Sequence, residues 1–237
     1  MSPSDLSRAI TEESWDQARK IVQMCPEKAG SWTKRDGLFD GKTAANVLPL
    51  HEALVGGAPF EVIKDLVFAY PKALTKKETS YDRLPLHISC RKHADPSVVQ
   101  LLVNQYKDAA LEPDSLNRLP IHYALTNGAE DCIIDILMKA APESARGCDY
   151  KGWNPIFVAL NVQASSHVVR ELLEANPESV LMRTQRGTSI RGVIPKDSAY
   201  HNEMIRLVTE KKKEINQEVH LPSLKRNPLR ASRMIMV

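Results

Sequence analysis

The most constraining feature of this sequence is one pattern that occurs four times with a period of 35 to 36 residues. Each copy opens with a proline, and the openings are 36, 35 and 35 residues apart: Pro49, Pro85, Pro120 and Pro155. An alanine, an apolar pair and a leucine recur at the same spacing, as Ala129, Ile133-Ile134 and Leu137 do in the third copy. Such self-similarity predicts a solenoid of stacked units instead of a single globular core.

Each copy is predicted to form two short helices. A proline is tolerated at the first position of a helix, where its missing N–H has no partner in any case, so Pro85–Cys90 is expected to be a first helix. Asp95 is expected to cap the second helix, in which Val98, Val99, Leu102 and Val103 recur at helical spacing. We expect that helix to be closed in successive copies at Pro71, Lys107, Pro142 and Pro177. Neighbouring pairs must then cover each other's apolar stripes.

Short motifs at the start of each copy point to a family. Leu-Pro-Leu-His at 48–51 and 84–87 and Leu-Pro-Ile-His at 119–122 resemble the Thr-Pro-Leu-His signature of ankyrin repeats. Asp149–Pro155 is similar to the Asp-x-x-Gly-x-Thr-Pro turn that precedes that signature. The resemblance covers about residues 36–208. It implies an all-α fold, an α-solenoid of stacked helix–turn–helix repeats with atypical capping repeats at its ends.

The chain also departs from the ankyrin pattern. Leu48, Leu84 and Leu119 stand where threonine is usual, Phe157 replaces the histidine in the fourth copy, and the period exceeds the usual 33 residues. We expect these changes to alter hydrogen bonds within the turns and not the architecture.

The domain organisation follows from this register. Four ankyrin-type repeats are predicted over residues 48–182, at about 48–80, 81–113, 114–148 and 149–182. Residues 1–30 are expected to form capping helices, residues 31–47 an inserted extended loop, and residues 183–217 a C-terminal capping repeat whose second helix holds Met204, Ile205 and Val208. Residues 218–237 are predicted to be a basic, flexible tail.

Charge and hydropathy argue against several classes of protein. The net charge is +3, and the segment from Thr209 onward alone carries +4, so the repeats are near neutral and lack the basic face of a nucleic-acid groove. No run of eighteen apolar residues occurs, and Met1–Ile10 does not resemble a secretory signal. We therefore expect no membrane span and a cytoplasmic or nuclear location. Cys90 and Cys132 occupy apolar helix positions, which is typical of small buried hydrophobic residues in a reducing compartment.

Two motifs raise alternatives. Gly37–Thr43 resembles a phosphate-binding loop, but it has three residues between its glycines instead of four, and no strand is predicted before it. His51, His87 and His122 recur once per copy without Cys, Asp or Glu at ligand spacing, so we expect no metal. The resemblance implies instead that each histidine hydrogen-bonds backbone in the adjoining turn. We expect no cofactor and no catalytic residue, and retain a nucleotide-binding or enzymatic role for loop 37–43 as the alternative function.

The positions that vary between copies predict a binding surface. The resemblance implies a concave face made by the turn tips and the exposed side of the first helices. The residue before the Leu/Asn-Pro step is Val47, Arg83, Arg118 and Trp153 in successive copies. The turn tips carry Tyr81, Leu116 and Lys151, and the first helices end at Arg91, Lys92, Thr126, Asn127 and Asn161.

This surface is basic in the middle and aromatic at one end. Tyr, Trp and Arg dominate interface hot spots because they combine large, stiff area with a polar group. We therefore predict a non-enzymatic interaction module, an adaptor or assembly subunit, which acts as a monomer or within a larger assembly. Its protein partner is expected to present carboxylates to Arg83 and Arg118 and an apolar group to Trp153, and the C-terminal tail is a second candidate contact.

Overall fold

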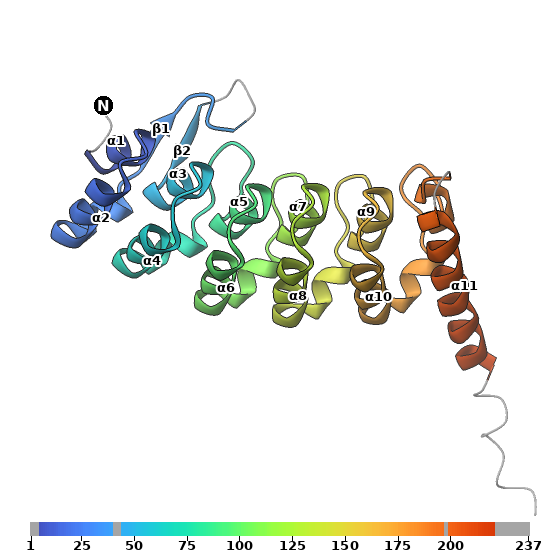
Figure 1. Ribbon diagram of the computed structural model, residues 1–237. Helices are drawn as coiled ribbons and strands as arrows, with labels where there is room; N and C mark the ends of the chain where they lie inside the picture. The colour runs from blue at the N-terminus through green and yellow to red at the C-terminus, as the bar shows by residue number, and fades with distance from the viewer. Residues whose placement is uncertain (1–4, 40–43, 197–198, 221–237) are drawn as a thin grey trace, which may run out of the picture.

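The computed structural model describes residues 5–39, 44–196 and 199–220 and shows a row of helix pairs (Figure 1). The first helices of the four pairs are α3 (Pro49–Val55), α5 (Pro85–Arg91), α7 (Pro120–Thr126) and α9 (Pro155–Asn161). The second helices are α4 (Phe60–Ala69), α6 (Pro96–Gln105), α8 (Asp131–Ala140) and α10 (Ser166–Ala175). The predicted all-α solenoid is confirmed.

Local sequence explains where these helices begin. A proline occupies the first position of every first helix, as the repeat predicted. The predicted cap of α6 is also present, since the Asp95 carboxylate accepts a hydrogen bond from the Ser97 N–H at 2.8 Å. The four apolar positions that the periodicity predicted for α6 are buried: Val98, Val99, Leu102 and Val103.

A third short helix follows each second helix and was not predicted. The 3₁₀ helices η2 (Pro71–Thr75), η3 (Lys107–Leu111), η4 (Pro142–Arg146) and η5 (Pro177–Leu181) begin at the residues that were expected only to close the second helices. At the N-terminal end, η1 (Pro26–Gly30) is an element of the same kind. The copy with Lys107 in place of proline forms the same element and buries Ala109 and Ala110. Proline is therefore not required there, and packing of small apolar residues between copies stabilises the turn.

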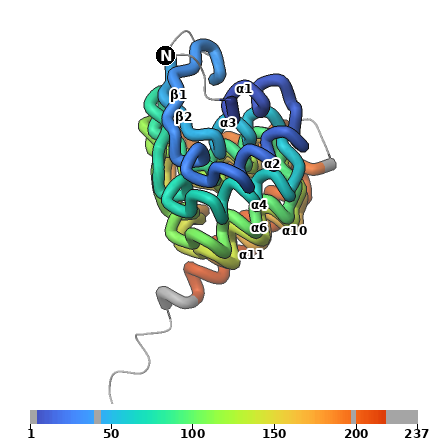
Figure 2. The backbone as a smooth tube through the Cα atoms, turned by 90° about the vertical axis from the view of Figure 1, so that its left-hand side faces the viewer, coloured from blue at the N-terminus to red at the C-terminus, as the bar shows by residue number. Residues whose placement is uncertain are grey.

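The copies pack on their immediate neighbours. First helices contact in the order α3, α5, α7, α9, and second helices in the order α4, α6, α8, α10. Figure 2 looks along the row and shows successive pairs lying behind one another. The buried apolar residues form one cluster that runs from Leu6 to Val208. The core is thus a long layer between the two rows of helices.

The N-terminal end adds a helix pair and a hairpin. Helices α1 (Asp5–Thr11) and α2 (Trp15–Met24) precede the antiparallel strands β1 (Thr33–Arg35) and β2 (Ala45–Val47), with Thr33 opposite Val47. The expectation of an extended loop without a strand at residues 31–47 was wrong. Ala45 and Val47 alternate with exposed Asn46 and are buried, so β2 has an inward face that stabilises the hairpin.

A buried carboxylate ties this end together. Glu52 of α3 is 3% exposed, accepts hydrogen bonds from the Ser7 hydroxyl at 2.7 and 2.8 Å, and lies 3.2 Å from Arg35 Nε. Burial raises the pKa of Glu52, and the contacts with Ser7 and Arg35 lower it in part. One side chain thereby joins α1, β1 and α3.

The C-terminal end is simpler than a full repeat. A short 3₁₀ helix, η6 (Ile190–Val193), stands in place of a first helix, and the 22-residue helix α11 (Ala199–His220) packs against α10 and η5. Met204 and Val208 of α11 are buried. The predicted flexible tail was expected to begin at residue 218, but α11 continues to His220, and the tail from residue 221 onward lies outside the described residues. No described helix is long and apolar enough to cross a membrane.

The cysteines differ from one another in burial. Cys90 is fully buried in α5, and burial raises the pKa of its thiol to about 12. The expectation for Cys132 was wrong, because this residue is exposed in the first turn of α8 while Ile133 and Ile134 are the buried positions.

Candidate partner-binding surface

An acidic side chain organises the turns that precede α5, α7 and α9. Asp114 Oδ1 accepts hydrogen bonds from the N–H groups of Leu116 and Arg118, both at 2.8 Å. Asp149 makes the same two bonds to Lys151 and Trp153, also at 2.8 Å. Each acid therefore fixes the backbone conformation at a predicted tip residue and at the residue two positions later.

Glu78 plays this role one copy earlier, where it accepts hydrogen bonds from the N–H groups of Ser80 and Tyr81 at 2.6 and 3.1 Å. Sequence reasoning did not single out Glu78 or Asp114. The sequence does contain a signal for these residues, because Glu78, Asp114 and Asp149 recur with the period of the repeat.

Neighbouring turns are joined through their backbones. The N–H groups of Ser115, Tyr150 and Gln185 donate to the carbonyls of Tyr81, Leu116 and Lys151 at 2.9, 3.0 and 3.2 Å. The predicted tip residues thus lie next to one another along the row, where the turns project beyond the first helices (Figure 1). We call this the turn surface: the turns before the first helices together with the C-terminal ends of those helices.

The repeated histidines link the copies and do not converge on a metal site. His87 Nδ1 accepts a hydrogen bond from the Leu84 N–H at 3.2 Å, so its proton is on Nε2, which donates to the Arg118 carbonyl at 3.1 Å. His122 makes equivalent bonds to Leu119 and Trp153, both at 3.0 Å. The predicted role in backbone hydrogen bonding is confirmed.

The remaining copies vary this link. His51 bonds to the Lys76 carbonyl at 3.0 Å. In the fourth copy Phe157 stands in place of the histidine, and Asn154 Oδ1 caps α9 by accepting a hydrogen bond from the Phe157 N–H at 3.2 Å. Burial lowers the pKa of His51 and of His87 to about 4, and also lowers that of His122. Among the described residues, no group of three or more His, Cys, Asp or Glu could hold a metal ion.

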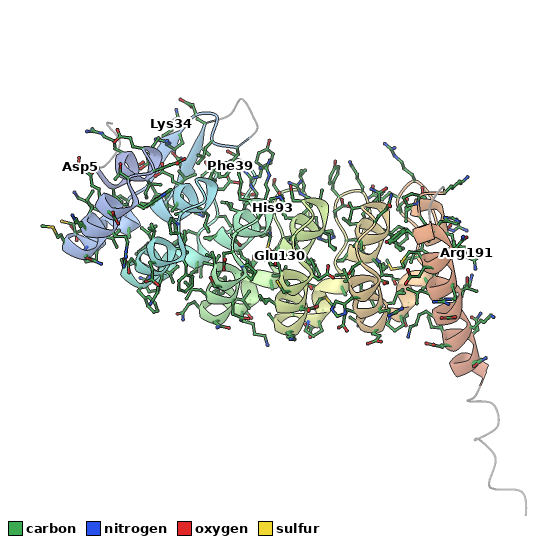
Figure 3. All side chains as sticks on the ribbon, in the orientation of Figure 1. Asp5, Lys34, Phe39, His93, Glu130 and Arg191 are labelled. Carbon is green, nitrogen blue, oxygen red and sulfur yellow. The ribbon has the colours of Figure 1, made fainter. Side chains whose placement is uncertain are left out.

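Arg83 differs from its predicted position. It was expected to meet a partner's carboxylate, but it is 1% exposed, and its Nε lies 2.8 Å from Glu78 Oε1. Its guanidinium lies 4.1 Å from the ring centre of Phe39 and 4.6 Å from that of Tyr81. Figure 3 shows Lys34 on the outer side of the hairpin and Phe39 on the side toward the stack. The inserted hairpin thus covers Arg83, which the repeat pattern could not indicate; Val47 is buried as well.

Arg118 is more accessible, with 28% of its side chain exposed. Its Nε and Nη2 lie 3.0 and 2.8 Å from Asp114 Oδ2, and its guanidinium carbon lies 4.4 Å from the ring centre of Tyr123. The Tyr123 hydroxyl donates to the same carboxylate at 2.7 Å. Burial alone would raise the pKa of Asp114, but these hydrogen bonds and the Arg118 charge lower it overall.

The turn surface contains a hollow of about 400 Å³ between the second and third copies, which we call the central hollow. Most of the predicted site residues line it: Tyr81, Arg83, Arg91, Leu116, Arg118, Thr126 and Asn127. His122 and Tyr123 complete the wall and were not predicted as site residues. Three-dimensional packing thus brings together residues that are separated by a full period in sequence.

The other predicted residues lie elsewhere. Lys151 and Trp153 line a second hollow of about 440 Å³, the C-terminal hollow, together with Tyr150, Thr184, Gln185, Arg186 and Thr188. Trp153 is partly buried, with its ring 6.5 Å from that of Phe157. Lys92 is exposed beside the turn between α5 and α6, and Asn161 is exposed at the end of α9. The structure thus separates the predicted surface into two hollows and two outlying side chains.

The structure contradicts one expectation for loop 37–43 and agrees with another. A strand, β1, does precede Gly37, contrary to expectation, but the chain then enters β2 and not a helix. A phosphate-binding loop depends on the helix N-terminus that follows it. Residues 40–43 of the motif lie outside the described residues.

Comparison with known families gives one match. Residues 86–183 match a family model described as "Ankyrin repeats (3 copies)". No curated protein sequence matches the chain significantly.

Proposed function

The chain is an ankyrin-repeat protein, and from this premise we propose that it is a non-enzymatic protein–protein interaction module, an adaptor or assembly subunit. Ankyrin repeats are general protein-interaction modules. The partner binds the turn surface, which corresponds to the concave face of an ankyrin stack. The observation that supports this most directly is the central hollow, where most of the predicted site residues form one wall.

The chemistry of the turn surface suggests the chemistry of the partner. Arg118 in the central hollow and Lys151 and Arg186 in the C-terminal hollow favour acidic groups. Trp153 and the 48%-exposed Tyr150 offer apolar area with a polar edge. The partner therefore presents both acidic and apolar side chains, and Arg83 contributes its charge from beneath the surface. A cytoplasmic or nuclear location and a contact through the tail remain part of the proposal.

A matched pair of variants tests the location of the binding surface. Partners are captured from the native source with the full-length chain and identified by mass spectrometry, and binding is then measured with the purified partner. We expect Arg118→Gln combined with Trp153→Ala to weaken binding at least tenfold while helicity by circular dichroism stays unchanged. The control combines Lys139→Gln with Phe68→Ala, a cation and an aromatic residue that are exposed on the second helices. Equal binding by both double variants would refute the proposal.

A further inference from the structure

Three arginines converge on the central hollow from different parts of the fold. Arg83 comes from the turn before α5, Arg91 from the last position of α5, and Arg118 from the turn before α7. Among the described residues, no acidic side chain lines this hollow. Glu78 and Asp114 lie behind the arginines, buried in the turns. The wall that a ligand meets is therefore cationic and aromatic.

The guanidinium groups of Arg83 and Arg118 are held before any ligand arrives. The Arg83 guanidinium lies close to the rings of Phe39 and Tyr81 and is bonded to Glu78. Arg118 lies over Tyr123 and is bonded to Asp114. Side chains that are already ordered lose little entropy on binding, and planar guanidinium groups suit the two oxygens of a carboxylate.

Both groups also retain hydrogen-bonding capacity. Arg83 Nη2 is buried and has no hydrogen-bond partner among the described residues. The bonds from Arg118 to Asp114 use Nε and Nη2, which leaves Nη1 for a ligand. Because Arg83 is 1% exposed, its donor lies beneath the surface and contributes charge, while Nη1 of the 28%-exposed Arg118 is the donor that a ligand can reach.

We propose that the central hollow is a carboxylate pocket, which receives an aspartate or glutamate side chain from an acidic segment of the partner. This inference rests on the proposed function, since it takes the partner to be a protein bound on the turn surface. Glu78 and Asp114 are ion-paired with Arg83 and Arg118 and offset part of their positive charge, so a singly charged carboxylate fits better than a doubly charged phosphate. The chain's own segment from Thr209 onward carries seven Lys or Arg against three Glu, so the arginines of the hollow favour an acidic partner segment over it.

Short peptides test the pocket directly on the full chain. Hexaglutamate is titrated into ¹⁵N-labelled protein at 150 mM salt, with hexaglutamine as the neutral match and a phosphoserine hexapeptide as the phosphate match. We expect hexaglutamate to shift the amide signals of Leu116, Arg118 and Thr126, and the other two peptides to bind at least fivefold more weakly. Binding of hexaglutamine or of the phosphoserine peptide as tight as that of hexaglutamate overturns the proposal.

Two equivalent positions provide the variant and its control. Thr126 and Asn161 are both exposed at the last position of a first helix, but only Thr126 lines the central hollow. Thr126→Glu places a carboxylate at the mouth of the pocket and should weaken hexaglutamate binding at least tenfold. Asn161→Glu adds the same charge one helix further along, at about 10 Å, a distance over which salt screens it, and should change binding less than twofold. Equal effects of the two variants would show non-specific attraction and overturn the proposal.

The Arg118→Lys variant tests whether binding needs the planar guanidinium group or only a positive charge. Lysine keeps the positive charge but lacks the planar set of N–H groups that lets Arg118 bond to Asp114 and still present Nη1 to a ligand. We expect at least a fivefold loss of hexaglutamate affinity, whereas unchanged affinity contradicts a carboxylate pocket. If hexaglutamate does not bind while the Arg118→Gln, Trp153→Ala variant still loses its partner, the pocket is refuted and the proposed function stands. If that double variant keeps its partner, the proposed function fails whatever the peptides do.

Discussion

At the scale of single residues, the repeated histidine links each copy to the next. His51 and His87 are fully buried and bond only to backbone through both ring nitrogens. Their burial lowers the pKa of each ring from about 6.5 to about 4. Between these two pH values the unfolded chain binds a proton at each histidine and the native chain does not. The contribution of these neutral histidines to stability is therefore complete above the unfolded pKa, and it is lost as the pH falls from 6.5 toward 4.

We predict that acidification from pH 7 to pH 5 lowers the free energy of unfolding by roughly 2 kcal/mol for each of these two histidines, from 1.36 kcal/mol per pKa unit. Urea denaturation at the two pH values measures the loss. The fourth copy suggests the control, because Asn154 and Phe157 occupy the positions of Leu84 and His87 there. Leu84→Asn with His87→Phe should reduce the loss by roughly 2 kcal/mol. An identical pH dependence in this variant would contradict the assignment.

At the scale of elements, the turns form a stack of their own beside the helices. Acidic residues shape the turns before α5, α7 and α9, and backbone hydrogen bonds join one turn to the next. Gly152 lies at a junction of this kind. Its φ is +74°, and a Cβ there would lie 3.0 Å from Gln185 N, the backbone group that donates to the Lys151 carbonyl. A side chain at Gly152 would therefore disturb the junction between the fourth turn and the one after it.

Gly187 offers a matched control for Gly152. Its φ is +77°, but nothing lies within 4 Å of the added Cβ. We expect Gly187→Ala to cost about 1 kcal/mol of stability for the left-handed backbone alone. Gly152→Ala should cost about 1 to 2 kcal/mol more, because the facing backbone must move. Chemical denaturation measures the free energy of unfolding of both variants. Equal decreases would contradict the prediction that the backbone at Gln185 resists a side chain at Gly152.

At the scale of the whole molecule, each copy is stabilised by its neighbours. Helix α11 covers α10 and η5, and no described element beyond α11 packs on the stack. In such a linear arrangement, the loss of one end weakens the nearest copies most, because stability is a sum of intrinsic and nearest-neighbour terms.

We predict that a chain ending at Leu181, which lacks η6 and α11, loses amide protection mainly in α9 and α10 and keeps it in α3 and α5. Hydrogen exchange followed by mass spectrometry resolves the copies. A chain ending at His220 is the control, since it retains every described element, and its exchange should match that of the full chain. Uniform loss of protection along the row of the shorter chain would indicate a single cooperative core instead.

The sequence by itself determined the architecture of this protein. Prolines, apolar pairs and histidines recur at one period, and each depends only on its own helix and on the adjoining copy. Local and nearest-neighbour rules were therefore enough to predict the solenoid and the starts of the first helices. The backbone hydrogen bonds of His51, His87 and His122 were implied by the resemblance to ankyrin repeats. The residues of the turn surface could also be named, because their position within each copy is a matter of register.

Only the tertiary structure decided what those residues face. Arg83 and Arg118 occupy equivalent positions just before their Leu-Pro steps, yet Arg83 is buried because the inserted hairpin places Phe39 on it, and Arg118 stays partly open. The central hollow likewise depends on side chains from two copies. Exposure and charge balance arise from contacts between segments that the repeat does not relate to one another, so no pattern within one copy can encode them.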